Sequence, residues 1–269
     1  MGEEGREKRL GGNTETANED FAQRRAAARE KLDAIDPHHS PGGAEADPLR
    51  KDWFEAVYAL AGDDPAGVPW ANLAPHPLLT DWLEGRRLTG RALDVGCGLG
   101  DNAEALSAAG AAVTAFDLVA GAIVWARRRF PETTVDHHAA DLFDAPVAWR
   151  GAFDLVHECY TLQALPEALL PQASAALAGF VAPGGALLVI ARAREEGEIP
   201  PRPPWPLTRA RIEALAEQGL AIETIEDIPA RDGLVRHWRA LFRRPAHRRP
   251  LSVKLVRVDR RDAAPPAEP

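Results

Sequence analysis

The sequence predicts an α/β fold, in which a mostly parallel sheet carries helices on both faces. Two observations predict it: short apolar runs alternate with segments rich in helix-forming residues, and a glycine-rich loop joins the first run to the first helix. The composition agrees, since a chain of 269 residues with 45% hydrophobic and 27% charged residues can build a sizeable core.

The predicted strands include short apolar segments at 91–97, 111–118, 153–158 and 185–192, and a weaker strand at 133–140. Two segments of alternating pattern, at 220–228 and 237–244, could form a final antiparallel pair. The predicted helices lie between them, at 101–109, 120–130, 166–180 and 208–218. Residues 168–191 carry no charge over a length that could cross a bilayer. Because Pro183 and two glycines interrupt this stretch, we expect a helix, a turn and a buried strand there, and no membrane partner.

Three regions are expected. Residues 1–48 form a mobile appendage with a possible helix over 21–35, residues 49–258 form the main domain with a helical cap at 49–89, and residues 259–269 form a disordered tail. Two cysteines exclude a disulfide scaffold and, with a polar N-terminus that lacks a secretory signal, favour a cytoplasmic location. A net charge of −8 argues against a nucleic-acid partner.

The loop at 94–100 is the clearest candidate site. Gly96, Gly98 and Gly100 stand at alternate positions after Asp94, so a ligand can lie against bare backbone at the end of the first strand. A dinucleotide loop needs a different spacing, and Asp101 stands where its third glycine belongs. An acid there would repel a pyrophosphate and would suit a ligand with a cationic part. A tight turn without a ligand is the alternative.

Acids follow the next two strands in the order that a nucleoside site requires. Asp117 ends the second strand 21 residues after Gly96, where a carboxylate can accept both ribose hydroxyls. Asp141 and Leu142 follow the third strand, where an acid and a backbone N–H can bind the edge of an adenine. A solvated acid at a strand end is the alternative for each.

The motifs LDVGCGLG, AFDL, ADLF, FDLVHE and GFVAPGGALLVIAR resemble those of class I S-adenosylmethionine-dependent methyltransferases. The resemblance implies a Rossmann-like, doubly wound, seven-stranded sheet with an antiparallel last strand, and S-adenosyl-L-methionine as cofactor. The segment before the loop, with Trp53, Pro69 and Trp70, is similar to the thiopurine and halide methyltransferase branch. The cofactor-binding residues implied are Trp70, Asp94, Gly96, Gly98, Gly100, Asp117, Leu118, Asp141 and Leu142.

The catalytic candidates follow the strand at 153–158, nearest the expected position of the methyl group. His157 is the candidate general base, Glu158 could bind a cationic group, and Tyr160 could offer a hydroxyl or a stacking face. A structural polar role is the alternative for each. His76 is expected on a surface loop, and no residue cluster suggests a metal.

The branch resemblance favours transfer of a methyl group to a small-molecule thiol or other soft nucleophile. The first alternative is an O- or N-methyltransferase of a specialised metabolite with His157 as base. The second is a non-catalytic module that binds the cofactor, and RNA through its Arg-rich segment at 231–262. We expect a monomer or a homodimer.

Overall fold

The computed structural model describes residues 4–37, 50–198, 200, 202–231 and 233–246, with side chains from residue 19 onward. Its seven-stranded sheet has the order β3-β2-β1-β4-β5-β7-β6. The strands are β1 (Arg91–Val95), β2 (Ala112–Asp117), β3 (Asp136–Ala139), β4 (Phe153–Cys159), β5 (Val181–Arg192), β6 (Ala221–Ile228) and β7 (His237–Arg243). Strand β7 runs antiparallel to both of its neighbours, and the other pairings are parallel. The predicted α/β fold class with an antiparallel last strand is confirmed.

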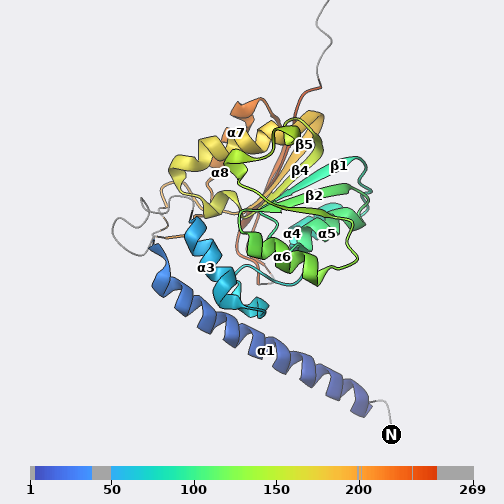
Figure 1. Cartoon of the computed structure of the whole chain (residues 1–269), viewed down its shortest axis with the longest axis vertical. Coiled ribbons are helices and arrows are strands. Elements are labelled where there is room, and N and C mark those ends of the chain that lie inside the picture. The colour runs from blue at the N-terminus through green and yellow to red at the C-terminus, as the bar shows by residue number, and fades with distance from the viewer. Residues whose placement is uncertain (1–3, 38–49, 199, 201, 232, 247–269) are drawn as a thin grey trace, which may run out of the picture.

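Helices cover both faces of this sheet (Figure 1). They are α1 (Glu4–Ile35), α3 (Lys51–Ala61), α4 (Pro77–Leu83), α5 (Asp101–Ala108), α6 (Ala120–Arg129), α7 (Leu170–Phe180) and α8 (Arg209–Glu213). Helices α7 and α8 lie on one face and α4, α5 and α6 on the other, while α3 and α1 lie at one end of the sheet. Strands β1 and β4 are neighbours near the middle of the sheet. Their carboxyl ends therefore lie between the two helical layers.

The core consists of two apolar layers, because successive strand residues point to opposite faces. On the face of α7, Leu93 and Val156 are fully buried, and on the face of α5 the same holds for Ala92 and Leu188. Each large apolar side chain buried in this way stabilises the fold by about 1.5–3 kcal/mol. The two layers fix the position of the loops that leave β1 and β4.

The N-terminal region differs from the expected appendage. Helix α1 runs from Glu4 to Ile35 rather than over a short segment. Its last turns dock on the cap: Leu32 is 2% exposed and packs with Val57 and Tyr58 of α3. Just after the helix, Asp36 forms a buried ion pair with Arg50, with 2.6 Å between Oδ2 and Nη2. The mobility predicted for residues 38–48 and the tail at 259–269 lie outside the described residues.

Two predicted helices are shorter than expected. The helix expected at 166–180 begins at Leu170, with Pro171 in its first turn, where a missing backbone N–H costs nothing. The helix expected at 208–218 ends at Glu213 and continues as a 3-10 turn over Ala214–Gln218.

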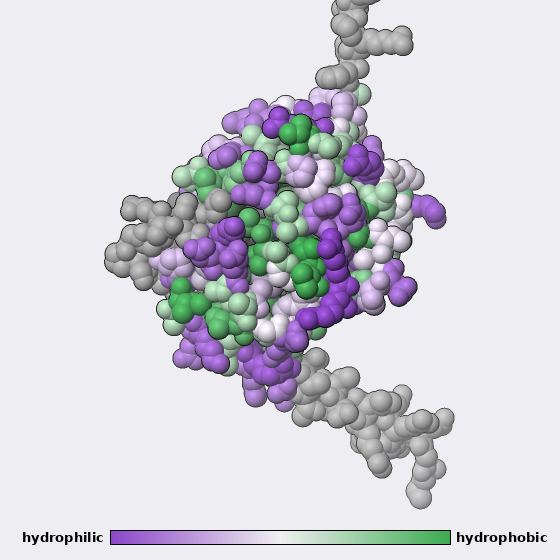
Figure 2. All heavy atoms as spheres, in the orientation of Figure 1, coloured by the Kyte–Doolittle hydropathy of each residue, from purple (hydrophilic) through white to green (hydrophobic). Residues whose placement is uncertain are grey.

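The surface mixes polar and apolar side chains (Figure 2). The large exposed apolar residues come from different elements, among them Leu60 on α3, Val124 on α6 and Ile222 on β6. Among the described residues, no helix is both long and apolar enough to span a membrane.

Candidate active site

A cavity of about 540 Å³ opens at the carboxyl ends of β1, β2, β4 and β5. Its volume is within the range of small-molecule sites. Its walls come from the glycine loop, from the turns after β2, β3 and β4, and from the cap helices. Open α/β sheets bind their ligands at this edge.

Gly98 forms the floor of the cavity. Its φ of 53° lies in the left-handed region, and a Cβ at this position would lie 3.5 Å from Tyr58 Oη and 3.7 Å from Trp70 Nε1. A side chain larger than a methyl group would therefore fill the space between the loop and the aromatic residues above it. The missing side chain therefore lets the loop and these aromatic residues lie close together at the floor of the cavity.

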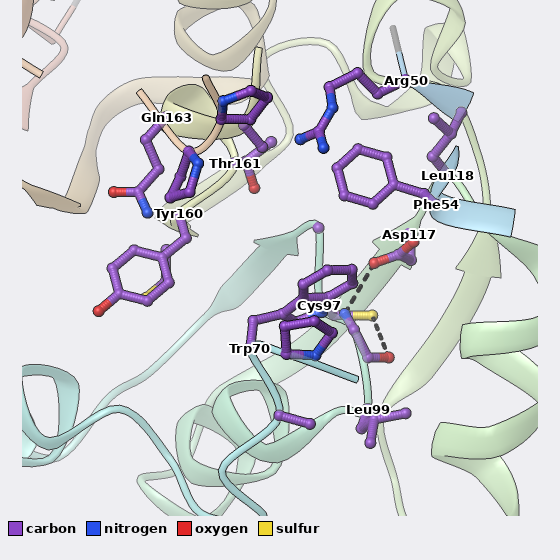
Figure 3. A pocket seen from close by; sticks show the side chains of 18 of the residues that line it. Arg50, Phe54, Trp70, Cys97, Leu99, Asp117, Leu118, Tyr160, Thr161 and Gln163 are labelled. Carbon is purple, nitrogen blue, oxygen red and sulfur yellow. Dashed lines mark hydrogen bonds between the residues drawn. The ribbon is translucent and has the colours of Figure 1, made fainter. Parts of the chain in front are cut away.

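Aromatic side chains from the cap form the opposite wall. The Trp70 ring lies over the loop and donates from Nε1 to Tyr58 Oη at 3.3 Å. Trp53 and Phe54 of α3 pack against Trp70 at centroid distances of 6.0 and 5.5 Å. Figure 3 shows Trp70 beside Cys97 and Phe54 next to Arg50. The structure thus brings Trp53, Pro69 and Trp70 to the cavity.

Asp117 lies where a ribose is expected. Its Oδ2 accepts from Gly98 N and its Oδ1 from Val119 N, both at 2.9 Å. Burial raises the pKa of this carboxyl, while the two backbone hydrogen bonds oppose the rise. Each oxygen has a second lone-pair site, so the carboxylate can also accept from two ligand hydroxyls. Leu118 lies beside it on the cavity wall.

Asp141 and Leu142 line the cavity next to Asp117. The Oδ1 atom of Asp141 accepts from Phe143 N at 2.8 Å. This bond fixes the carboxylate and leaves its second oxygen to accept from an exocyclic amine such as that of adenine. The glycine loop, Asp117 and Asp141 therefore line the same cavity, as the sequence predicts.

Asp101 lines the cavity but does not carry a free negative charge. Both of its oxygens bond to Arg129 of α6, at 2.6 and 2.8 Å. The expectation that this acid suits a cationic ligand is therefore not met, because Arg129 already balances its charge.

Four predicted site residues lie outside the cavity. His157 and Asp94 are buried beneath the loop, with 2.7 Å between His157 Nδ1 and Asp94 Oδ1. Their positions follow from the register, which pairs Asp94 with His157 in the middle of the sheet. The expectation that His157 reaches the acceptor is not met by this geometry. Gly100 is the N-cap of α5, and a Cβ there would lie 3.3 Å from Ala126 Cβ, so its role is close packing on α6.

Glu158 is the fourth of these residues. It is fully buried, and its Oε2 accepts from Thr161 N at 2.9 Å and from Leu162 N at 3.3 Å. Burial raises the pKa of this carboxyl to about 8. The side chain therefore holds the turn after β4 and does not face the expected position of a cationic ligand.

Tyr160 does line the cavity, between two histidines. Its hydroxyl lies 2.9 Å from His76 Nε2 and 2.7 Å from His237 Nε2. Tyr160 has a φ of 73°, which is unusual for a residue other than glycine and turns its side chain out of the strand. His76 is 7% exposed, so the expected surface position is wrong.

Sequence reasoning missed His237 and Arg192 as site residues. They face one another across the β5–β7 ladder, and both line the cavity. Their only signal was position, because a residue at the end of β5 and one at the start of an antiparallel β7 meet at the same edge. The sequence did not predict the register of β5 against β7, so the pairing of Arg192 with His237 was not foreseen.

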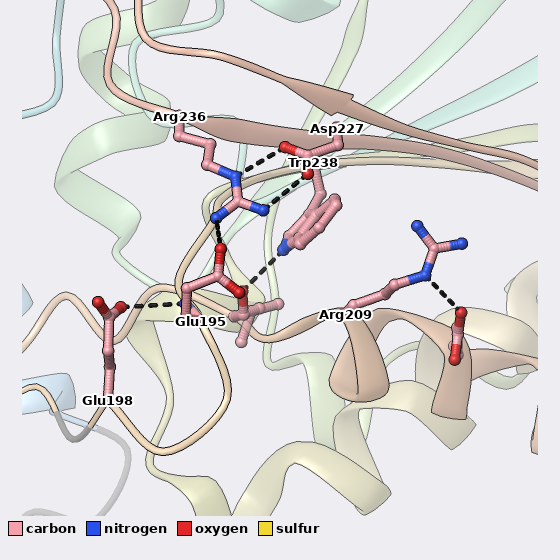
Figure 4. Close-up of polar contacts among 8 residues, drawn as sticks. Glu195, Glu198, Arg209, Asp227, Arg236 and Trp238 are labelled. Carbon is pink, nitrogen blue, oxygen red and sulfur yellow. Dashed lines mark hydrogen bonds and ion pairs between the residues drawn. The ribbon is translucent and has the colours of Figure 1, made fainter.

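The loop after β5 closes one side of the cavity with Pro203 and Pro204. Arg236 anchors the beginning of this loop: two of its nitrogens bond to Asp227 at 2.7 Å each, and a third pairs with Glu195 (Figure 4). The Pro-rich segment is thus part of the cavity wall.

Comparison with known proteins finds similarity to methyltransferases over the middle of the chain. Residues 92–185 match the family described as Methyltransferase domain. The chain is 38% identical over 115 residues to the ubiquinone biosynthesis O-methyltransferase of Aromatoleum aromaticum, and 37% identical over 114 residues to that of Thiobacillus denitrificans. Each match covers 41% of this chain and 48% of the relative, so it spans about half the length of these curated proteins.

Solved structures agree at the level of the fold. A protein from work on the conversion of a disulfide bond into a thioacetal group during echinomycin biosynthesis is 26% identical, with a TM-score of 0.60, over 72% of this chain and 93% of that one. The 1,6-didemethyltoxoflavin-N1-methyltransferase of Burkholderia thailandensis, solved with S-adenosylhomocysteine, is 18% identical, with a TM-score of 0.57, over 75% and 89%.

The cavity also fits the cofactor of this family. It offers bare backbone at Gly98, a buried carboxylate at Asp117 and a second acid at Asp141, which match the needs of a nucleoside. The branch resemblance to thiopurine and halide enzymes has no support among these matches. The segment at 92–185, which holds the glycine loop, Asp117 and Asp141, is thus similar to a methyltransferase domain.

Proposed function

We propose that this enzyme methylates a hydroxyl oxygen of a small-molecule acceptor. The observation that carries the proposal is the chain of side chains His76, Tyr160 and His237, which lies in the same cavity as the glycine loop. S-adenosylmethionine supplies an electrophilic methyl group, and the protein must hold the acceptor oxygen about 3 Å from it and exclude water.

Neighbouring backbone groups fix the protons along this chain. Leu78 N donates to His76 Nδ1 at 3.2 Å, so the proton of a neutral His76 is on Nε2 and points to Tyr160. His237 Nδ1 donates to the carbonyl of Val235, so its Nε2 is bare and accepts from the Tyr160 hydroxyl. Tyr160 thus accepts from His76 Nε2 and donates to His237 Nε2. A proton that leaves the Tyr160 hydroxyl therefore goes to His237 Nε2.

The charges of this group support a role in proton transfer. Burial lowers the pKa of His76 to about 3, and it also lowers the pKa of His237, so both rings are neutral near pH 7. Burial raises the pKa of Tyr160 to about 12, which keeps its hydroxyl protonated. A hydroxyl acceptor becomes strongly acidic as its oxygen gains the methyl group. Tyr160 can then take that proton while it passes its own to the weakly basic His237.

The curated relatives support oxygen as the acceptor atom, because both are named O-methyltransferases. A sulfur acceptor is the second candidate. It is favoured by the likeness to the protein studied for conversion of a disulfide bond into a thioacetal group. A thiolate needs no base at the moment of transfer, so the two candidates differ in their dependence on Tyr160.

A methyl-transfer assay over phenols, aliphatic alcohols, thiols and amines tests the proposal. We expect turnover with a hydroxyl acceptor and a loss of about 100-fold in kcat for Tyr160→Phe, with unchanged affinity for S-adenosylhomocysteine. His138→Asn is the matched control, because His138 pairs with Asp136 outside the cavity. Turnover confined to thiols, or a hydroxyl rate that Tyr160→Phe leaves unchanged, would contradict the proposal.

A further inference from the structure

Arg192 is a cation in the cavity without a counter-charge. It ends β5 and lines the cavity beside Tyr160, with its Cζ 5.5 Å from the centroid of the tyrosine ring. Its side chain is half-buried, and its Nε is buried with no hydrogen-bond partner among the described residues. No ion pair joins it to any acid in the part of the chain that the structure describes.

The acids that line the cavity are committed elsewhere. Asp33 pairs with Arg202, Asp36 with Arg50 and Asp101 with Arg129. Asp117 and Asp141 accept from backbone N–H groups at the expected nucleoside subsite. The groups that face Arg192 are Tyr160 and His237, which are neutral for the reasons given above. A half-buried guanidinium with no neighbouring anion is costly, and a bound anion removes that cost.

The position of Arg192 separates it from the expected nucleoside subsite. The backbone N–H of Arg192 donates to Gln163 Oε1 at 2.7 Å, so its main chain is held by the turn after β4. Its guanidinium lies over the Tyr160 ring and its backbone bonds to Gln163, and both of these residues belong to the segment that follows β4. An anion bound by Arg192 would therefore lie at the end of the cavity that holds the His76–Tyr160–His237 group.

We propose that Arg192 binds a carboxylate of the methyl acceptor, so that the substrate is a hydroxy acid. The inference rests on the proposed function and names its substrate class. Arginine suits this task because its planar fork can make two parallel hydrogen bonds to a carboxylate. The bond would hold the acid end of the substrate while its hydroxyl reaches Tyr160.

Calorimetry on the full chain saturated with S-adenosylhomocysteine tests this. The probes are salicylate, 3,4-dihydroxybenzoate and 3-hydroxybutyrate, each beside its neutral amide. We expect at least one acid to bind about tenfold more tightly than its amide, and Arg192→Gln to remove that preference. Arg209→Gln is the control, because Arg209 pairs with Glu213 on α8, away from the cavity (Figure 4).

The outcomes separate the sources of the anion. If Arg192→Gln lowers the affinity for S-adenosylhomocysteine itself by about tenfold, Arg192 binds the carboxylate of the cofactor and the inference is overturned. No preference for any acid over its amide also overturns it. Failure of the wild-type chain to bind S-adenosylhomocysteine at all would instead refute the proposed function.

Discussion

Replacing Asp117 by Asn removes the charge that the structure places at the expected ribose. One side-chain oxygen remains to accept from a backbone N–H, and the new amide group cannot accept from a hydroxyl. Hydrogen bonds to a charged group contribute about 1.5–3 kcal/mol each, and one of the two expected ribose bonds is lost outright while the other is weakened. We expect a loss of about 2–3 kcal/mol of binding free energy, which is roughly 30–150-fold in Kd.

The assay is calorimetric titration of S-adenosylhomocysteine into the wild type and the variant. Because Asp117 also holds Gly98 N and Val119 N, thermal unfolding without ligand must be measured in parallel, to separate affinity from stability. Asp144→Asn, at an exposed acid in the turn after β3, is the matched control. An Asp117→Asn protein that folds normally and binds S-adenosylhomocysteine like the wild type would refute the ribose assignment.

The remaining predictions concern the loop and the buried acid. Gly98→Val should abolish measurable S-adenosylhomocysteine binding, because its methyl groups fill the space below Trp70. Gly62→Val is the control, because Gly62 also has a positive φ but has no atom within 4 Å of an added Cβ, so this variant should bind normally. Equal binding by both variants would contradict a cofactor site on the glycine loop. Glu158 keeps its proton to about pH 8 when folded but loses it near its ordinary pKa when unfolded, so wild-type stability should fall as pH rises between these values. In Glu158→Gln this fall, roughly 2–4 kcal/mol by denaturant titration, should disappear, and parallel pH profiles of the two proteins would refute the raised pKa of the buried Glu158 carboxyl.

The central strands β1, β2, β4 and β5 could be predicted from the sequence because each is a short apolar run between turn residues. The central strand residues Leu93 and Val156 are fully buried, as expected for apolar residues of a parallel sheet that is covered on both faces. The extent of α1 could not be predicted in this way. Its contact through Leu32 with Tyr58 depends on tertiary packing that the local pattern does not specify.

The cofactor side of the site could be predicted because it depends on local geometry. Gly98 and Asp117 lie at the ends of adjacent strands, and parallel strands bring those ends together. The acceptor side depends on long-range contacts. His76, Tyr160 and His237 come from three segments separated by about 80 residues each, and only the pairing of β5 with β7 brings the last of them to the cavity.

His157 shows why a strand-end residue need not enter the cavity. It was the natural base by residue type, but its register opposite Asp94 places both side chains inside the protein. Tyr160 reaches the cavity because the chain leaves the strand there with a positive φ. A positive φ is expected from sequence chiefly at glycine or asparagine, so the conformation of Tyr160 could not be predicted.

Titration of S-adenosylhomocysteine and of NAD into the wild-type chain tests the central claim most directly. One molecule of S-adenosylhomocysteine per chain should bind with a Kd in about the micromolar range, and NAD should not compete. Saturable binding of NAD in place of S-adenosylhomocysteine, or binding of neither, would contradict a methyl-donor site on the glycine loop.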